Sequence, residues 1–399
     1  MSGAERPARV AVFSAYGVQG TMFASLVTRV PTLQDRFGLS DGELGLLLLA
    51  VPIVAGLGSV LAGWLSSRYG SAIVLRVAQP AVCVMVVLVG TAPRFGLFLL
   101  ALGAFAVVLG MVDALAGIQG VLIEQRYARN IMHGFFSAWS LAGIAGAGLT
   151  SLTNHYDIAL GPALSIVAAA GIAASAYTGR WLLHGRPVAV DTAPARIPMR
   201  PVWLVGLVVA FMYVADAATA NFSAHYLQNG LGADDTVGPL AYAFYQAAMV
   251  LGRASADRLV GRYGPVSTLR AGGLIALVGI AIATVAPGPW IAIAGFFVLG
   301  VGLCPVAPQG FTAAGELDPT GSGVAVARIN LFNYAGFVVG APLIGIVSEA
   351  ATERVAFGLL VIFAVGIVVL AGGYDPVRLR SAVPGEVAEP APQPATEPG

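Results

Sequence analysis

Long apolar stretches with very few charges follow one another along this chain, and they restrict the folds open to it. Hydrophobic residues make up 57% of the 399 residues and charged residues only 10%, whereas an average soluble domain has roughly 25% charged residues. A helix needs about 20 consecutive apolar residues to cross the hydrocarbon core of a bilayer. The composition therefore predicts an all-α, polytopic membrane protein with lipid as its solvent.

Twelve of these stretches are predicted to span the membrane. The first, from about Arg9 to Val30, is longer than the apolar region of a cleaved signal peptide, so we predict that it is retained. The other predicted spans cover approximately 43–65, 73–92, 96–122, 135–154, 158–183, 202–226, 237–258, 269–287, 290–315, 323–347 and 355–373.

Polar segments divide this series into two equal parts. We predict a six-helix half at 1–183, a linker with Pro and Arg at 184–201 and a second six-helix half at 202–373. Residues 374–399 are rich in Pro and Glu, which is the composition of a disordered tail.

A short motif occurs at corresponding places in the two halves. Segments 68–76 and 262–270 both begin Arg-Tyr-Gly and end Leu-Arg, and they lie 194 residues apart. The same offset separates other identical pairs: Leu33 and Leu227, Gln34 and Gln228, and Gly38 and Gly232. A constant offset of about half the chain indicates an internal duplication. In a membrane protein such repeats are typical of secondary transporters.

The arginines predict the orientation of the chain in the membrane. If the N-terminus is inside, four of the 21 basic residues fall in outside loops: Arg29, Arg36, Arg94 and Arg354. Arg328 lies within a predicted span, and the remaining sixteen fall in or beside cytoplasmic segments. Because basic residues concentrate in cytoplasmic loops, we predict a multi-pass protein of the cytoplasmic (inner) membrane with both termini in the cytoplasm.

The repeated motif resembles the inter-helix signature of the major facilitator superfamily, Gly-x-Leu-x-Asp-Arg-x-Gly. The residues that carry this likeness and the gating role it implies are Gly63, Arg68 and Gly70, then Gly252, Arg253, Asp257, Arg258 and Gly264. Ser67 occupies the acidic position of the first copy, so an acid remains only near the second copy, at Asp257. The likeness to a poorly characterised bacterial branch lies in Arg29-Val-Pro-Thr-Leu, Asp41-Gly-Glu43-Leu-Gly45 and segment 216–227. The resemblance covers residues 8–373 and implies two six-helix halves.

Two carboxylates inside predicted spans are the candidates for proton coupling. Asp216 lies near the middle of the seventh span and Asp113 in the fourth. An ionised side chain costs at least ~2.5–3.5 kcal/mol at mid-membrane, so each predicts either a water-accessible functional site or a partner on a neighbouring helix. Glu124, nearer the membrane edge, is predicted to pair with a nearby Arg.

Other polar and aromatic residues within the spans are candidates to line the substrate site. The resemblance places spans one, four, seven and ten around the cavity, with parts of five, eight and eleven. The candidates are Tyr16, Gln19, Trp139, Asn221, Tyr245, Gln246, Gln309, Asn333 and Arg328. Singly, each neutral residue is also compatible with an ordinary helix–helix hydrogen bond. Arg328 is either a counter-ion for Asp216 or a substrate, or it extends to the membrane surface, which we favour.

These features predict a secondary active transporter of a small organic molecule, working by alternating access and coupled to protons. Export is predicted by analogy with related families. Proton-coupled uptake of a small metabolite and a non-transporting scaffold or sensor are the alternatives. The chain has no Lys and therefore no Gly-x-x-x-x-Gly-Lys loop for ATP. Its four His are scattered, so we expect no enzyme activity, cofactor or bound metal. Membrane lipid but no nucleic acid is the expected partner, and the protein is expected to be a monomer.

Overall fold

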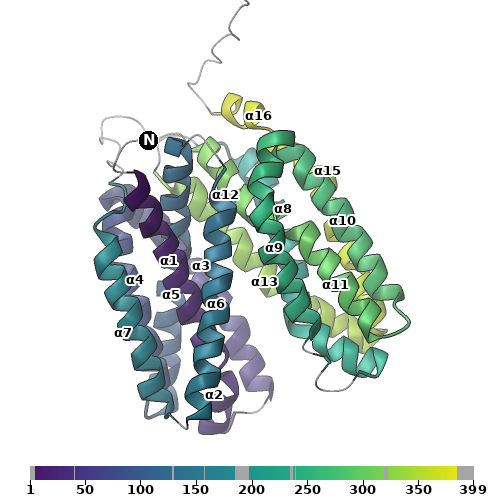
Figure 1. Cartoon of the computed structure of the whole chain (residues 1–399), viewed down its shortest axis with the longest axis horizontal. Coiled ribbons are helices and arrows are strands. Elements are labelled where there is room, and N and C mark those ends of the chain that lie inside the picture. Colours follow the sequence, from purple (N-terminus) through teal and green to yellow (C-terminus); the bar gives the residue numbers. More distant parts are fainter. Residues whose placement is uncertain are drawn as a thin grey trace, which may run out of the picture.

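The computed structural model describes residues 5–39, 41–127, 130–156, 158–184, 197–233, 237–238, 240–318 and 322–383. Within these ranges the regular elements are all helical. They form two bundles that lie side by side in Figure 1.

The first bundle is built from α1 to α7, which pack on one another around α1 and α5. Their bounds are α1 Glu5–Val27, α2 Val30–Phe37, α3 Asp41–Tyr69, α4 Ser71–Thr91, α5 Phe95–Tyr127, α6 Met132–His155 and α7 Leu160–Gly179. Glycines allow close approach of the helices where hydrophobicity cannot drive association. A Cβ added at Gly110 of α5 would lie 1.9 Å from the Ala55 carbonyl oxygen of α3.

The second bundle follows the same plan. Its elements are α8 Met199–His225, the π-helical turn η1 Tyr226–Gly230, α9 Leu240–Tyr263, α10 Pro265–Val285, α11 Pro289–Leu303, α12 Val306–Leu317, α13 Val324–Ala350, α14 Glu353–Gly358, α15 Leu360–Leu370, the 3-10 turn η2 Ala371–Tyr374 and α16 Pro376–Ser381. Gly336 and Gly340 let α13 approach α8, because an added Cβ would lie 2.6 Å and 2.5 Å from the carbonyl oxygens of Ala210 and Val214.

The predicted tenth span is one apolar segment that the structure divides into α11 and α12. The break falls at Cys304-Pro305, where proline has no N–H to continue the helical bonds. The Cys304 thiol lies 3.2 Å from the Val301 carbonyl, the group that would otherwise accept from residue 305.

Ten helical segments in the described part of the chain are long and apolar enough to cross a membrane. Each of the twelve predicted spans coincides with helix, but α6 and α9 are not among the ten. Both are 24 residues long, and α9 is the more polar of the two. His133 and Ser140 lie on α6, and Arg253 and Asp257 lie on α9. These two helices pack against each other across the two bundles.

The duplication is visible in the backbone of the turns. Gly70 and Gly264, 194 residues apart, have φ of 85° and 78°, and they separate α3 from α4 and α9 from α10. Gly38 and Gly232, with the same offset, have φ of 61° and 68°. A left-handed conformation favours glycine, which explains why glycine occurs at both copies of each turn.

Both Arg-Tyr-Gly turns lie at the end of the molecule that carries the N-terminus and α16, because successive long helices run antiparallel (Figure 1). This end is called the basic end below. The prediction of a disordered tail from residue 374 is wrong for its first residues. Residues 376–381 form α16, whose Arg380 Nε donates to Glu316 Oε2 at 2.7 Å and whose Leu379 is buried. Residues 384–399, like 185–196 of the predicted linker, lie outside the described residues.

Candidate functional site

Asp113 lies near the middle of α5 and is bonded by both bundles. Gln19 Nε2 of α1 donates to its Oδ1 at 2.9 Å, and the Tyr334 hydroxyl of α13 donates to its Oδ2 at 2.9 Å. Asn330, one turn before Tyr334, also interacts with this carboxylate. The partners come from α1 of the first bundle and α13 of the second, so α5 positions an acid that the fold uses to join the two halves.

Asp216 lies on α8 in the second bundle and is more deeply buried, with 9% of its surface exposed. Its carboxylate interacts with the Tyr245 hydroxyl and with the charge of Arg253, both from α9. Arg253 is itself buried; its Nη1 donates to Ser140 Oγ of α6 at 2.9 Å. The arrangement places an acid and its counter-charge at the junction of the bundles.

Several buried polar atoms have no hydrogen-bond partner among the described residues. Among them are the Tyr16 hydroxyl, Gln19 Oε1 and Asn333 Oδ1. Their residues are each more than nine-tenths buried, and Tyr16 and Gln19 lie close to Asp113. A buried polar group without a partner costs about 1–3 kcal/mol, so these atoms are available to a bound small molecule.

The remaining candidate residues are not all gathered at this place. Trp139 is half-buried and packs 5.8 Å from the Phe23 ring. Gln246 donates to the Tyr242 hydroxyl at 2.8 Å on the same helix. Gln309 is buried and lines a cavity of about 230 Å³ at the basic end, together with Thr312 and Arg380.

Two candidates lie away from Asp216. Asn221 is exposed and its amide donates to the Ala217 carbonyl of its own helix at 2.7 Å. Arg328 is exposed, with Nη1 3.3 Å from the Met199 sulfur. The alternative in which Arg328 is the counter-ion of Asp216 is therefore wrong, because Arg253 takes that place and Arg328 extends to the surface.

The repeated signature residues differ between the two bundles. In the first, Ser67 Oγ donates to the Trp64 carbonyl of its own helix, and exposed Arg68 lies over Trp64 and Tyr69. Gly63 packs against Ala327 of the other bundle. In the second bundle, Gly252 packs against Cys304, and Arg258 is exposed.

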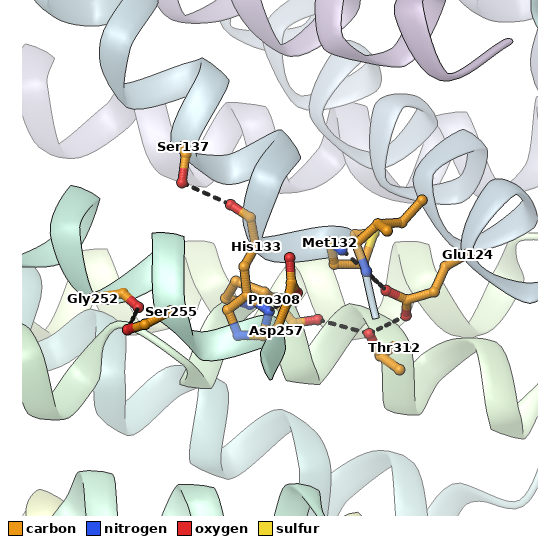
Figure 2. Close-up of polar contacts among 10 residues, drawn as sticks. Glu124, Met132, His133, Ser137, Gly252, Ser255, Asp257, Pro308 and Thr312 are labelled. Carbon is orange, nitrogen blue, oxygen red and sulfur yellow. Dashed lines mark hydrogen bonds and ion pairs between the residues drawn. The ribbon is translucent and has the colours of Figure 1, made fainter. Parts of the chain in front are cut away.

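Asp257 makes a direct bond between the bundles (Figure 2). Its Oδ1 lies 2.6 Å from Nδ1 of His133, at the first turn of α6. Close by, Glu124 accepts from the backbone N–H groups of Ile131 and Met132 at 2.7 Å and 3.0 Å and from the Thr312 hydroxyl of α12. Among the described residues, the free N–H groups at the start of α6 bind the Glu124 carboxylate; Arg129, one of the predicted partners, lies outside the described residues.

Sequence reasoning missed His133 as a functional candidate, since a single histidine at a span end has no local signature. Ser59 was missed for the same reason; its Oγ on α3 donates to the Ala327 carbonyl and accepts from Asn330. The sequence signal that could have drawn attention to His133 was the 194-residue offset of the duplication. This offset relates His133 to Ala327 and Asp257 to Gly63.

Comparison with known sequences agrees with this architecture. The sequence model of the Major Facilitator Superfamily matches residues 205–397. An uncharacterized MFS-type transporter of Yersinia pestis is 32% identical over 349 residues, covering 86% of this chain and 90% of that protein. The chain belongs to the Major Facilitator Superfamily, as the resemblance of its repeated motif predicted.

Solved structures share the fold at low sequence identity. The transporter FucP, in the outward conformation, superposes with a TM-score of 0.76 at 15% identity, covering 92% of this chain and 98% of FucP. The proton:xylose symporter XylE gives a TM-score of 0.71 at 14% identity, covering 93% of this chain and 95% of XylE. The predicted all-α membrane fold is thereby confirmed; of its twelve spans, ten meet the criteria of length and apolarity.

Proposed function

We propose that this chain is a proton-coupled secondary transporter of a small organic molecule and that Asp113 carries the coupled proton. Membership of the family supports transport. The observation that carries the proton assignment is the position of Asp113, whose two oxygens accept hydrogen bonds from α1 of the first bundle and α13 of the second.

Protonation of Asp113 changes the junction between the bundles. The ionised carboxylate accepts from both Gln19 and Tyr334, and bonds to a charged acceptor are about twice as strong as neutral ones. When a proton binds, one oxygen becomes an O–H donor and the charge is lost, which weakens the bond to Tyr334. The bundles are then free to rearrange, and release of the proton restores the junction. Alternating access needs such a linkage between proton binding and bundle position.

The proposed orientation places the basic end in the cytoplasm of a bacterial cell, because arginines concentrate in the segments at that end. Hydrogen bonds join the bundles there: His133 with Asp257, Glu124 with Thr312, and Gln125 with the Gly315 carbonyl. The ribbons of the two bundles diverge toward the opposite end in Figure 1. We therefore assign the conformation as outward-facing.

The direction of substrate movement has two candidates. Export is our first proposal, in exchange for protons. Proton-coupled uptake is the second, since FucP is described as a fucose:proton symporter and XylE as a proton:xylose symporter. Both use the same proton site and differ only in whether proton and substrate move in opposite directions or together.

A proteoliposome assay with a trapped pH-sensitive dye tests the proposal. A thermal-shift screen of sugars, amino acids and organic acids first selects a substrate, which is then added outside. Inward substrate flux should make the interior more alkaline for an exchanger and more acidic for a symporter. Asp113→Asn should abolish proton movement, whereas Glu349→Gln, an exposed carboxylate near the opposite end, should leave it unchanged. Equal proton movement in Asp113→Asn and the unmodified protein would refute the assignment.

A further inference from the structure

His133 and Asp257 form the polar contact that most directly joins the first turn of α6 to α9. Nδ1 of the imidazole lies 2.6 Å from the carboxylate oxygen, the His133 side chain is fully buried, and the Asp257 side chain is 28% exposed. Figure 2 shows the two side chains close to each other. This pair is called the inter-bundle bridge below.

The duplication provides an internal comparison for the inter-bundle bridge. His133 and Ala327 are 194 residues apart, and so are Gly63 and Asp257. Gly63 lies against Ala327, with an added Cβ at 2.8 Å from the Ala327 Cβ. The same two positions are thus in contact twice across the two bundles. One contact is made by small apolar residues, and the other by a histidine and a carboxylate, so only one of them can respond to protons.

The same comparison shows that capping of the two helix starts is alike. Glu124 accepts from the first N–H groups of α6, and Asp318, 194 residues further on, accepts from Ser322 and Gly323 at the start of α13. Both helix starts therefore have an acidic cap, which is favourable at a helix N-terminus. At this end of the molecule, the caps are thus alike in the two halves and the inter-bundle bridge differs.

The charged groups nearest the inter-bundle bridge lie on α1, α5 and α9. His133 faces Asp257 of α9. The Glu124 carboxylate of α5 is near enough to interact with Asp257. Arg253 of α9 is bound about two turns further along α6, at Ser140. From α1, Arg9 lies over Phe13, whose ring packs between it and Phe135 of α6.

The neighbouring part of α12 contributes neutral groups to this region: the Thr312 hydroxyl, bound to Glu124, and Pro308 (Figure 2). Among the described residues, Asp257 is thus the carboxylate bound to His133, and Arg253 is bound to Ser140. A charge-assisted bond is about twice as strong as a neutral one.

We propose that the inter-bundle bridge senses cytoplasmic pH and that protonation of His133 holds the transporter in its outward-facing conformation. The proposal rests on the alternating access and orientation proposed above. Histidine changes its charge between about pH 5 and 8. When α6 and α9 separate at the basic end, the imidazolium loses the Asp257 carboxylate, whereas Glu124 stays with α6 in the first bundle. Low pH therefore favours the conformation in which the basic end is closed. As the pH rises, His133 becomes neutral, and only a weaker Nδ1–H bond to Asp257 remains.

Linkage makes this effect reciprocal, so opening of the basic end releases the His133 proton into the cytoplasm. This proton is distinct from the one at Asp113, because His133 lies at the cytoplasmic end of the molecule and is separated from the outside by the length of the bundle. The bridge regulates the cycle and does not carry the coupled proton.

A spin-label distance measurement tests the proposal without a substrate. Labels are placed at Ser67→Cys and Gly261→Cys, exposed positions on α3 and α9 that are 194 residues apart. No atom lies within 4 Å of a Cβ added at Gly261, so the label fits there. Buried Cys83 and Cys304 are replaced by Ala. Double electron–electron resonance in lipid nanodiscs then reports the ratio of closed to open basic ends between pH 5.5 and 8.5.

The closed-to-open ratio should be at least about fivefold higher at pH 5.5 than at pH 8.5, the lower limit typical of linked sites. His133→Gln and Asp257→Asn should each remove this dependence. The matched control is His225→Gln, whose histidine pairs with Glu353 at the opposite end; the dependence should persist in it.

A pH response that survives in His133→Gln and Asp257→Asn would overturn the proposal and point to another titrating group such as Asp113. A ratio that does not depend on pH in the unmodified protein would also overturn it. Because the readout is the distance between helices, failure of the proposed proton coupling in the transport assay leaves this test intact. If His133→Gln does not fold, Asp257→Asn breaks the same bridge from the other bundle.

Discussion

Tyr334→Phe is the substitution that most directly measures the Asp113 junction. It removes one hydroxyl, whose hydrogen bond of 2.9 Å joins α13 to α5, and it keeps the ring. The Gln19 bond to the other carboxylate oxygen remains. The change therefore deletes a single interaction between the bundles and creates almost no cavity.

The expected magnitude follows from the type of bond. A hydrogen bond to a charged group contributes about 1.5–3 kcal/mol, and each 1.4 kcal/mol is a factor of about ten. If this bond exists only in the outward-facing conformation, its loss should reduce the closed-to-open ratio by about 10- to 140-fold. A population of about 99:1 would become about 9:1 at the lower value, a change that distance distributions resolve.

The assay is the same spin-label pair at Ser67→Cys and Gly261→Cys, at a pH where Asp113 is ionised. Tyr242→Phe is the matched control, because the Tyr242 hydroxyl accepts from Gln246 within α9 and joins no second bundle. Tyr242→Phe should leave the ratio within about twofold of the unmodified protein. An equal effect of the two substitutions, or none from Tyr334→Phe, would show that Asp113 does not hold the bundles together.

Two further substitutions test the packing around the site, each against a control of the same residue type. Arg253→Gln should lower the thermal unfolding temperature markedly, because losing one partner of a buried charge pair costs about 3–5 kcal/mol; Arg328→Gln, at an exposed position, should change it little. Gly110→Val should greatly reduce the yield of folded protein in size-exclusion chromatography, since its Cβ would collide with α3. Gly103→Val on the same helix, where no atom lies within 4 Å of an added Cβ, should leave the yield unchanged. Equal losses of stability or of yield within either pair would contradict the packing described.

The helices were largely predictable because their signal is local. Each apolar stretch is long enough to cross the bilayer by itself, and lipid offers it no alternative to helix. The helix break at Cys304-Pro305 was not predicted, although the sequence contains the proline. A proline inside a membrane helix is also tolerated with a kink, and Pro52 lies within α3. The early start of the predicted tail was wrong because α16 depends on a distant partner, Glu316.

The site could be predicted only in part. Asp113 and Asp216 were identifiable because an acid within an apolar stretch is costly and therefore has a reason to be there. Their partners were not identifiable: Arg253 rather than Arg328 lies by Asp216, and Tyr334 bonds Asp113 across 221 residues of sequence. Which face of a membrane helix meets which neighbour depends on small differences in packing that no single helix encodes.

The sequence by itself determined the class of the protein. Apolar length and the 194-residue repeat are properties of consecutive residues, and they were sufficient for a duplicated helical membrane protein. Only the tertiary structure decided that the duplication is unequal in its chemistry. Gly63 meets Ala327 while Asp257 meets His133, because the two bundles present corresponding positions to each other. A contact between bundles is made by two residues far apart in the chain, so its chemistry becomes visible only when both are placed.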